Sequence, residues 1–219
     1  MHRQYLLSNL ARYGELWTKS PALILSPEDR AGEESRMSQI ASFVGAYSDC
    51  FERTCIPGHI TGSALVVSQD LGSVLLTLHR KLGAWLQLGG HSDGDPMTHQ
   101  VAMREALEES GLIGLEFLPY EHVLTLGQGH SPQGTPLTPL PFDLDCHVIP
   151  ARKSEPEHIH YDVRYLIVAD HRQPLVISDE SQDLRWFSLA EAKALTKEAS
   201  MVRQFVKLEW LKDRLHSRV

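Results

Sequence analysis

The sequence predicts an α+β core that carries a helical extension at its N-terminus. Three observations lead to this prediction: helical periodicity over residues 1–58, strand patterns after residue 58, and one helical segment that interrupts the strands. With 219 residues, 42% of them hydrophobic, the chain is long enough to bury one sizeable core. We therefore divide it into a helical extension, residues 1–58, and a main domain, residues 59–219.

The helical extension contains two apolar stripes, because its apolar residues recur at spacings of three and four. Ser26, followed by Pro27 and two acidic residues, is a start signal for the second helix. A two-helix unit this apolar would expose a large patch if it stood alone. We therefore expect burial, against the chain's own core or against a second copy in a homodimer, at Leu6, Leu10, Phe43 and Tyr47.

Eight segments of the main domain have strand patterns: residues 63–67, 73–78, 85–88, 115–118, 122–126, 143–149, 158–168 and 184–187. A helix is expected over residues 95–110, and two more begin at about Leu189 and Met201. Glycines and prolines crowd residues 127–141, which indicates a long loop. That loop is either a functional lid or a surface insertion.

The charge balance and the cysteines restrict partners and compartment. The chain has 28 acidic and 21 basic side chains, and its net charge of -7 repels phosphate backbones and anionic lipid. General nucleic-acid binding and membrane binding are therefore not expected. The 3 cysteines form no CxxC pair, which favours a reducing compartment, and no apolar run is long enough for a membrane span. We expect a cytoplasmic protein.

The most informative segment runs from Gly89 to Leu112. Asp95 or Thr98 can cap a helix whose first position suits Pro96, and Gly111 can end it. On that helix three carboxylates share one face, within a wedge of about 100°: Glu105, Glu108 and Glu109. Either this is a solvated acidic face, or a hard cation such as Mg²⁺ or Mn²⁺ offsets the crowding, with carbonyls of the Gly89-Gly90 turn as further ligands.

The same segment resembles the signature of the Nudix hydrolases, G-x5-E-x7-R-E-U-x-E-E-x-G-U, where U is a bulky aliphatic residue. The matching positions are Gly90, Arg104, Glu105, Glu108, Glu109, Gly111 and Leu112. Two positions depart from the signature. Pro96, next to Asp95, replaces the first glutamate, and the smaller Ala106 replaces the first aliphatic residue. Pro96 puts the rate and the helix geometry in doubt more than the reaction class.

The resemblance covers roughly residues 60–198, helped by segments 85–90 and 183–192 that are typical of the family. It implies an α/β fold, an α/β/α sandwich with a mixed sheet, and metal-dependent cleavage of the diphosphate in a small nucleoside diphosphate derivative. The implied metal ligands are Glu105, Glu108 and Glu109, to which our own reading of the segment adds Gly89. Arg104 would hold a neighbouring carboxylate, and Glu105 would be the base or a shared ligand. Glu121 and Glu180 are rival bases.

Two other functions compete with hydrolysis. A catalytically silent domain of this type could bind a metabolite as a sensor, although such domains typically lose the helix carboxylates that this chain retains. An isomerase on the same scaffold would need a cysteine in its pocket, and Cys146 is the only thiol inside the main domain.

A second feature is the strand that begins at His158. Alternation places His158, His160, Asp162 and Arg164 on one face of it. The apolar run that follows favours an interior strand whose polar face lines a cavity, rather than an exposed edge. We therefore predict substrate contacts on this face, with Arg164 on phosphate and the imidazoles on phosphate or metal. His91, directly after Gly90, is predicted to join them.

Overall fold

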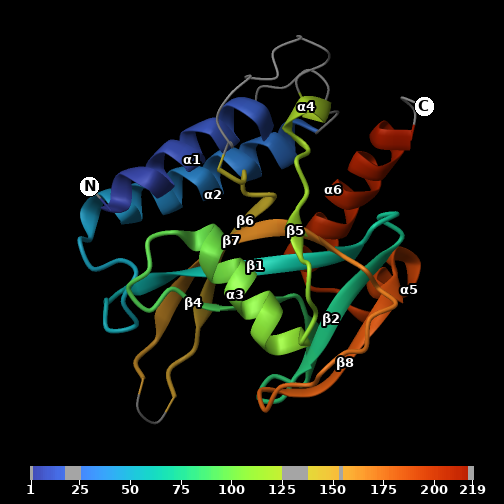
Figure 1. Cartoon of the computed structure of the whole chain (residues 1–219). Coiled ribbons are helices and arrows are strands. Elements are labelled where there is room, and N and C mark those ends of the chain that lie inside the picture. Colours follow the sequence, from blue (N-terminus) through green and yellow to red (C-terminus); the bar gives the residue numbers. More distant parts are fainter. Residues whose placement is uncertain (1, 18–25, 125–137, 153–154, 217–219) are drawn as a thin grey trace. The chain divides into compact units, whose positions relative to one another are not determined.

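The computed structural model describes residues 2–17, 26–124, 138–152 and 155–216 (Figure 1). The chain forms two compact units. The first comprises residues 1–61, 91–98 and 119–163, and the second comprises residues 62–90, 99–118 and 164–219. Two long strands, β1 (Gly58–Ser68) and β7 (His158–Ala169), contribute residues to both units. None of the described helices is long and apolar enough to cross a membrane.

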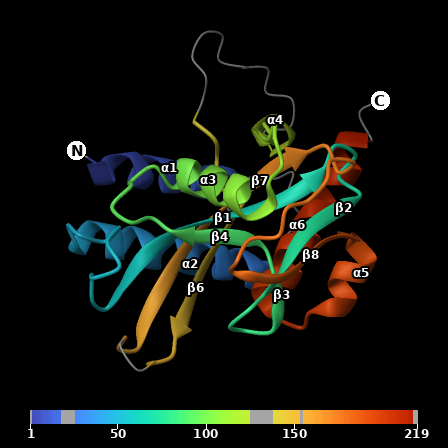
Figure 2. The same cartoon turned by 60° about the horizontal axis from the view of Figure 1, so that its bottom comes forward.

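The strands belong to a sheet of 8 strands, in which the order β3-β2-β1-β7-β5 is extended by β4 on β1, β6 on β7 and β8 on β2. The remaining strands are β2 (Ser73–His79), β3 (Ala84–Leu86), β4 (Leu88–His91), β5 (Glu116–Phe117), β6 (Asp143–Ile149) and β8 (Ser181–Ser188). Figure 2 shows β6 and β7 side by side. All 11 positions of β1 are buried, which is the pattern of a strand covered on both faces.

In the first unit, α1 (His2–Trp17) packs on α2 (Pro27–Ala46) and on the short helix α4 (Glu121–Leu124), and α2 packs on β6 (Figure 1). The predicted start of α2 is confirmed, because the Ser26 side chain accepts a hydrogen bond of 3.1 Å from the Asp29 backbone N–H. The helical periodicity and this cap are local signals, and both helices form where they were expected.

The predicted burial of the N-terminal helices is confirmed within their own unit. Leu6, Leu10 and Phe43 are buried, and Tyr47 is half-buried. Phe43 stacks on the ring of Tyr161 in β7 with centroids 4.1 Å apart. These contacts come from the same chain, so the apolar stripes need no second subunit to cover them. The homodimer stays a prediction, and so does the domain boundary between residues 58 and 59.

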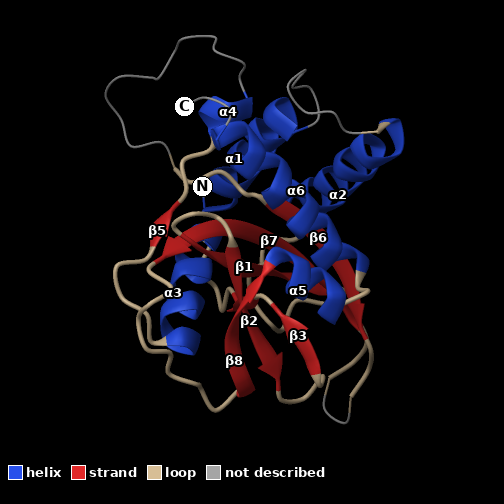
Figure 3. Ribbon diagram, turned by 90° about the vertical axis from the view of Figure 1, so that its right-hand side faces the viewer, coloured by secondary structure: helices blue, strands red, loops and turns tan. Residues whose placement is uncertain are grey.

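In the second unit, β2 lies between β3 and β8 (Figure 3). Its helices are α3 (Thr98–Ser110), most of which lies in this unit, α5 (Leu189–Leu195) and α6 (Ala199–His216). α5 begins at a capping box between Ser188 and Glu191, and it packs on both β8 and α6. Phe205, Leu208 and Leu211 bury the inner face of α6.

Three predicted elements differ from the structure. The strand predicted over residues 122–126 is wrong, because residues 121–124 form α4; so short an apolar run does not distinguish a helix from a strand. The strand predicted over residues 85–88 is divided into β3 and β4, which pair with different strands, β2 and β1. The helix predicted from residue 95 begins at Thr98, because Asp95 Oδ1 accepts a hydrogen bond from Met97 N (2.8 Å) in a turn before it. Most of the predicted loop over residues 127–141 lies outside the described residues.

Candidate active site and histidine cluster

Gly89 and Gly90 belong to strand β4 and not to the turn expected from the sequence, and two of the predicted carboxylates of α3 lie against this strand in the second unit. Glu109 is only 9% exposed, and its Oε1 accepts a hydrogen bond of 2.9 Å from the Gly89 backbone N–H. A Cβ at position 90 would lie 2.5 Å from the carboxyl carbon of Glu105, and a Cβ at position 89 would lie 2.3 Å from the hydroxyl oxygen of Ser63. Gly89 therefore allows a close approach to Ser63 that a side chain would obstruct, whereas a side chain at position 90 would require the Glu105 carboxyl group to move.

Burial raises the pKa of both carboxylates. For Glu109 burial is the main cause of a rise to about 7; the Gly89 N–H opposes the rise, and neighbouring carboxylates reinforce it. Burial also raises the pKa of Glu105, although the Arg104 guanidinium acts to lower it. Arg104 Nη2 lies 2.9 Å from Glu105 Oε1. Glu180 adds repulsion to both groups. Carboxylates thus crowd together beside β4 where they are partly shielded from water, and a bound cation would offset their repulsion.

Glu108, the third carboxylate of the predicted wedge, is exposed. It lines an open groove of about 360 Å³ together with His99, Gln100, Met103, Arg104, Leu107 and Phe117. Of the two rival bases, Glu180 acts electrostatically on Glu105 and Glu109, whereas Glu121 is ion-paired with Arg12 in the first unit. The structure therefore associates Glu180, and not Glu121, with the α3 carboxylates.

Glu109→Gln is expected to change how stability depends on pH when metal is removed by a chelator. The folded state holds the Glu109 proton more tightly than the unfolded chain does, so its contribution lowers the free energy of unfolding as the pH rises from about 4.5 to about 7. The variant should match the parent at pH 4.5 and exceed it at pH 8 by up to about 3 kcal/mol. Urea unfolding across this range measures the difference, with the exposed Glu116→Gln as control. A difference that does not vary with pH would contradict the prediction.

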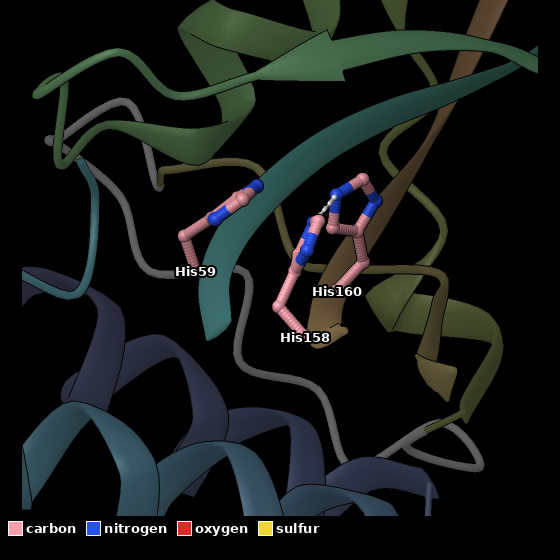
Figure 4. A group of neighbouring side chains, drawn as sticks. All are labelled: His59, His158 and His160. Carbon is pink, nitrogen blue, oxygen red and sulfur yellow. Dashed lines mark hydrogen bonds between the residues drawn. The ribbon is translucent and has the colours of Figure 1, made fainter. Parts of the chain in front are cut away.

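The first unit gathers five imidazoles near the starts of β1 and β7. Among the described parts of the chain, one group of His, Cys, Asp or Glu brings three potential ligand atoms within 4.8 Å of one another: His59, His158 and His160. Figure 4 shows His59 on β1 and the other two on β7. His91 lies beside this group, with its ring centroid 5.0 Å from those of His59 and His160. His147 on β6 lies 5.5 Å from His160, also between ring centroids.

Three of these imidazoles, those of His59, His91 and His160, are held in their neutral form. Burial, with the neighbouring imidazoles of His91 and His158, lowers the pKa of His59 to about 4. Burial and the surrounding imidazoles lower the pKa of His160 to about 2, and burial is also the main cause of the lowered pKa of His91. These three side chains are therefore uncharged at pH 7, a form that suits a metal ligand better than an anion-binding group.

The other predicted substrate-binding residues divide between the two units. Asp162, two residues after His160 in the sequence, is buried. Its Oδ1 accepts a hydrogen bond of 2.8 Å from the Thr61 hydroxyl in the first unit. Arg164 is 3% exposed and belongs to the second unit. Cys146, the thiol that an isomerase would need, is half-buried on β6.

Two histidines of the cluster, His59 and His147, were missed by sequence reasoning. A signal for His59 was present, because His59, Thr61 and Ser63 alternate along a strand that is otherwise apolar, as the polar residues of β7 do. His147 carries a weaker signal: Asp145 stands two residues before it, on the same face of β6, and its Oδ2 lies 3.0 Å from His147 Nδ1.

Several known proteins resemble the chain. The family model described as NUDIX domain matches residues 58–208. A NUDIX-family hydrolase from Clostridium perfringens is 26% identical, with 70% of this chain and 97% of that chain covered and a TM-score of 0.48. An Ap4A hydrolase from C. elegans is 17% identical (68% and 94% covered, TM-score 0.49), and the NUDIX domain of Shewanella oneidensis NrtR, complexed with ADP ribose, is also 17% identical (80% and 97% covered, TM-score 0.45). No curated protein sequence matched.

The family match covers more than half of the chain and includes β4 and all of α3. It confirms the predicted α/β fold with a mixed sheet and packed helices, and it agrees with the resemblance read from the motif. Nudix hydrolases act on the phosphoric anhydride bonds of nucleoside diphosphate derivatives, and they generally need divalent cations. The chain belongs to the NUDIX family and is a hydrolase of phosphoric anhydride bonds.

Proposed function

We propose that this hydrolase depends on Mg²⁺ or Mn²⁺ and cleaves the diphosphate linkage of a small nucleoside diphosphate derivative. One observation carries the proposal: Glu109 is hydrogen-bonded to strand β4 and Glu105 lies against it, and burial, with repulsion from neighbouring carboxylates, raises the pKa of both. A catalytically silent sensor would gain nothing from two buried carboxylates that repel each other.

The donor set suits a hard cation. Carboxylate oxygens are the protein ligands that Mg²⁺ and Mn²⁺ prefer, and in this proposal they come from Glu105, Glu108 and Glu109, with the Gly89 carbonyl as a further donor. A divalent cation bound there would polarise the diphosphate and make an attacking water more acidic. It would also offset the repulsion among these side chains.

Each residue around the α3 carboxylates has a distinct proposed role. Arg104 holds the Glu105 carboxylate through its ion pair, and the Gly89 N–H orients Glu109. Glu105 is the proposed base or shared ligand, because its raised pKa favours accepting a proton from water. Glu180 is its rival. The exposed Glu108 lies where an incoming substrate could meet it without rearrangement of the core.

The substrate contacts proposed from the sequence are His91, His158, His160, Asp162 and Arg164. Of these, Arg164 is the one whose charge suits a phosphate, since the neutral imidazoles of His91 and His160 give little attraction to an anion. The proposed partner is a small-molecule diphosphate. A cytoplasmic location and a homodimer stay part of this proposal.

A substrate screen tests the proposed function. The full chain is incubated with nucleotide sugars, dinucleoside polyphosphates, ADP-ribose, NADH and nucleoside triphosphates, with Mg²⁺, with Mn²⁺ and with a chelator. We expect hydrolysis at a phosphoric anhydride bond that requires the cation and stops with the chelator. Complete silence across the set would favour the sensor, and hydrolysis that persists in the chelator would contradict the metal dependence.

A further inference from the structure

We propose that His59, His158 and His160 bind a first-row transition-metal ion, Zn²⁺ in the first place, with none of the α3 carboxylates among the ligands. The proposed ligands belong to the first unit and the α3 carboxylates belong to the second. The inference assigns His158 and His160 to a metal ion in place of the substrate contact that the sequence suggested for them. The histidine site would be a second metal site of different chemistry in the same chain.

The spacing of the nitrogens fits a tetrahedral metal. Nε2 of His158 and Nε2 of His160 lie 3.3 Å apart (Figure 4). A tetrahedral zinc ion with Zn–N distances of 2.0–2.1 Å separates its ligand nitrogens by about 3.3–3.4 Å. His59 offers a nitrogen within 4.8 Å of both, so a movement of roughly 1–2 Å, within reach of a side-chain adjustment, completes a three-nitrogen site.

His59 supplies the strongest indication of a missing partner. Its side chain is 3% exposed, and both ring nitrogens are buried without a hydrogen-bond partner among the residues that the structure describes. Buried polar atoms almost always have a hydrogen-bond partner in folded proteins, so an imidazole that lacks one at both nitrogens needs an explanation. A metal ion bound to one of its nitrogens provides that partner.

The surroundings of His158 have the arrangement expected of a metal ligand. Its Nδ1 lies 2.9 Å from the Pro156 carbonyl oxygen. A carbonyl can only accept, so Nδ1 carries a hydrogen, and Nε2, the nitrogen that faces His160, is the one left to bind a metal ion. Metal-bound histidines almost always donate their second N–H to a carbonyl or carboxylate in this way.

The donor type selects the metal. Three imidazole nitrogens suit Zn²⁺ and its neighbours in the first row, whereas Mg²⁺ and Mn²⁺ prefer oxygen. Three protein ligands leave a fourth position for water, and His91 lies next to the group. The histidines and the α3 carboxylates therefore should not compete for one ion.

Zinc binding by the full chain tests the proposal. After chelator treatment, Zn²⁺ alone is titrated against a chromophoric chelator and bound zinc is counted by mass spectrometry. We expect one zinc per chain, unaffected by millimolar Mg²⁺, and X-ray absorption that places imidazole nitrogens at about 2.0–2.1 Å. His59→Gln and His160→Gln should each weaken binding by about 10² or more, because even the loss of a supporting hydrogen bond costs 10-fold to 100-fold.

Matched variants separate this site from the others. His171→Gln, at an exposed position of the second unit, should retain the zinc, and so should the double variant Glu105→Gln/Glu109→Gln. Circular dichroism shows which variants fold. If neither histidine variant folds, X-ray absorption of the zinc-loaded parent shows whether imidazole nitrogens bind the zinc. No tight zinc, zinc retained by folded His59→Gln and His160→Gln, or zinc lost with the carboxylates would each overturn the proposal.

Discussion

Glu108→Gln is expected to lower turnover by about 10² or more at saturating Mg²⁺, on whichever substrate the screen identifies. Glutamine keeps the size and hydrogen-bonding capacity of the side chain but removes one negative charge from the proposed metal site. Glu108 is exposed, so the substitution should leave the packing of α3 and the apo stability intact. The stabilisation that added Mg²⁺ confers on the parent should shrink in the variant.

The exposure of Glu108 makes the test sharp, because a loss of activity cannot be attributed to a damaged core. Glu116→Gln, an exposed carboxylate on β5 outside the proposed site, serves as the control and should retain parental turnover. Steady-state kinetics and thermal unfolding with and without Mg²⁺ measure both effects. Near-parental turnover and an unchanged metal response would remove Glu108 from the mechanism and favour a solvated acidic face.

The α3 segment was predictable because its signals are local. Glu105, Glu108 and Glu109 are placed by helical spacing alone, and Gly111 ends the helix with φ of 67°, the left-handed conformation that glycine favours. The raised pKa of Glu109 was not predictable. It depends on burial and on the distant Glu180, and both are properties of the folded unit rather than of the helix.

The histidine cluster was predictable only in part, because it too depends on residues that the fold brings together from distant parts of the chain. Alternation along β7 placed His158 and His160 on one face, but His59 reaches them from a strand about a hundred residues earlier in the chain. Local patterns do not reveal which strands are neighbours. The five imidazoles therefore become one group only when β1, β4, β6 and β7 are assembled.

The N-terminal helices illustrate the same limit with apolar residues. Their stripes predicted burial at Leu6, Leu10 and Phe43, but not what would cover them. The two helices pack on each other, and further cover comes from α4 and β6, which lie far along the chain and in the same compact unit. Trp17 is the clearest case, since it is fully buried with its ring 5.8 Å from Tyr120 and 5.6 Å from Phe142, measured between centroids.

Trp17→Ala is therefore expected to lower the free energy of unfolding by about 3–5 kcal/mol, the range for removing a large buried aromatic side chain. The substitution leaves a cavity among Tyr120 and Phe142, and it removes the hydrogen bond of 3.2 Å that the Trp17 indole N–H donates to the Tyr120 hydroxyl. Tyr120 keeps its own bond to the Pro141 carbonyl, so the loss is mainly one of packing. Urea unfolding and thermal denaturation measure the change.

Trp17→Phe provides the matched comparison, because it keeps an aromatic ring in the same place and gives up only the indole N–H and part of the volume. Its loss of unfolding free energy should be less than half that of the alanine variant.

Deleting residues 1–55 should have the largest effect, since it would uncover Tyr120, Phe142 and Tyr161 together and cause aggregation. A soluble, fully active truncation, or an alanine variant within about 0.5 kcal/mol of the parent, would show that the helices are a dispensable attachment rather than half of the first unit's core.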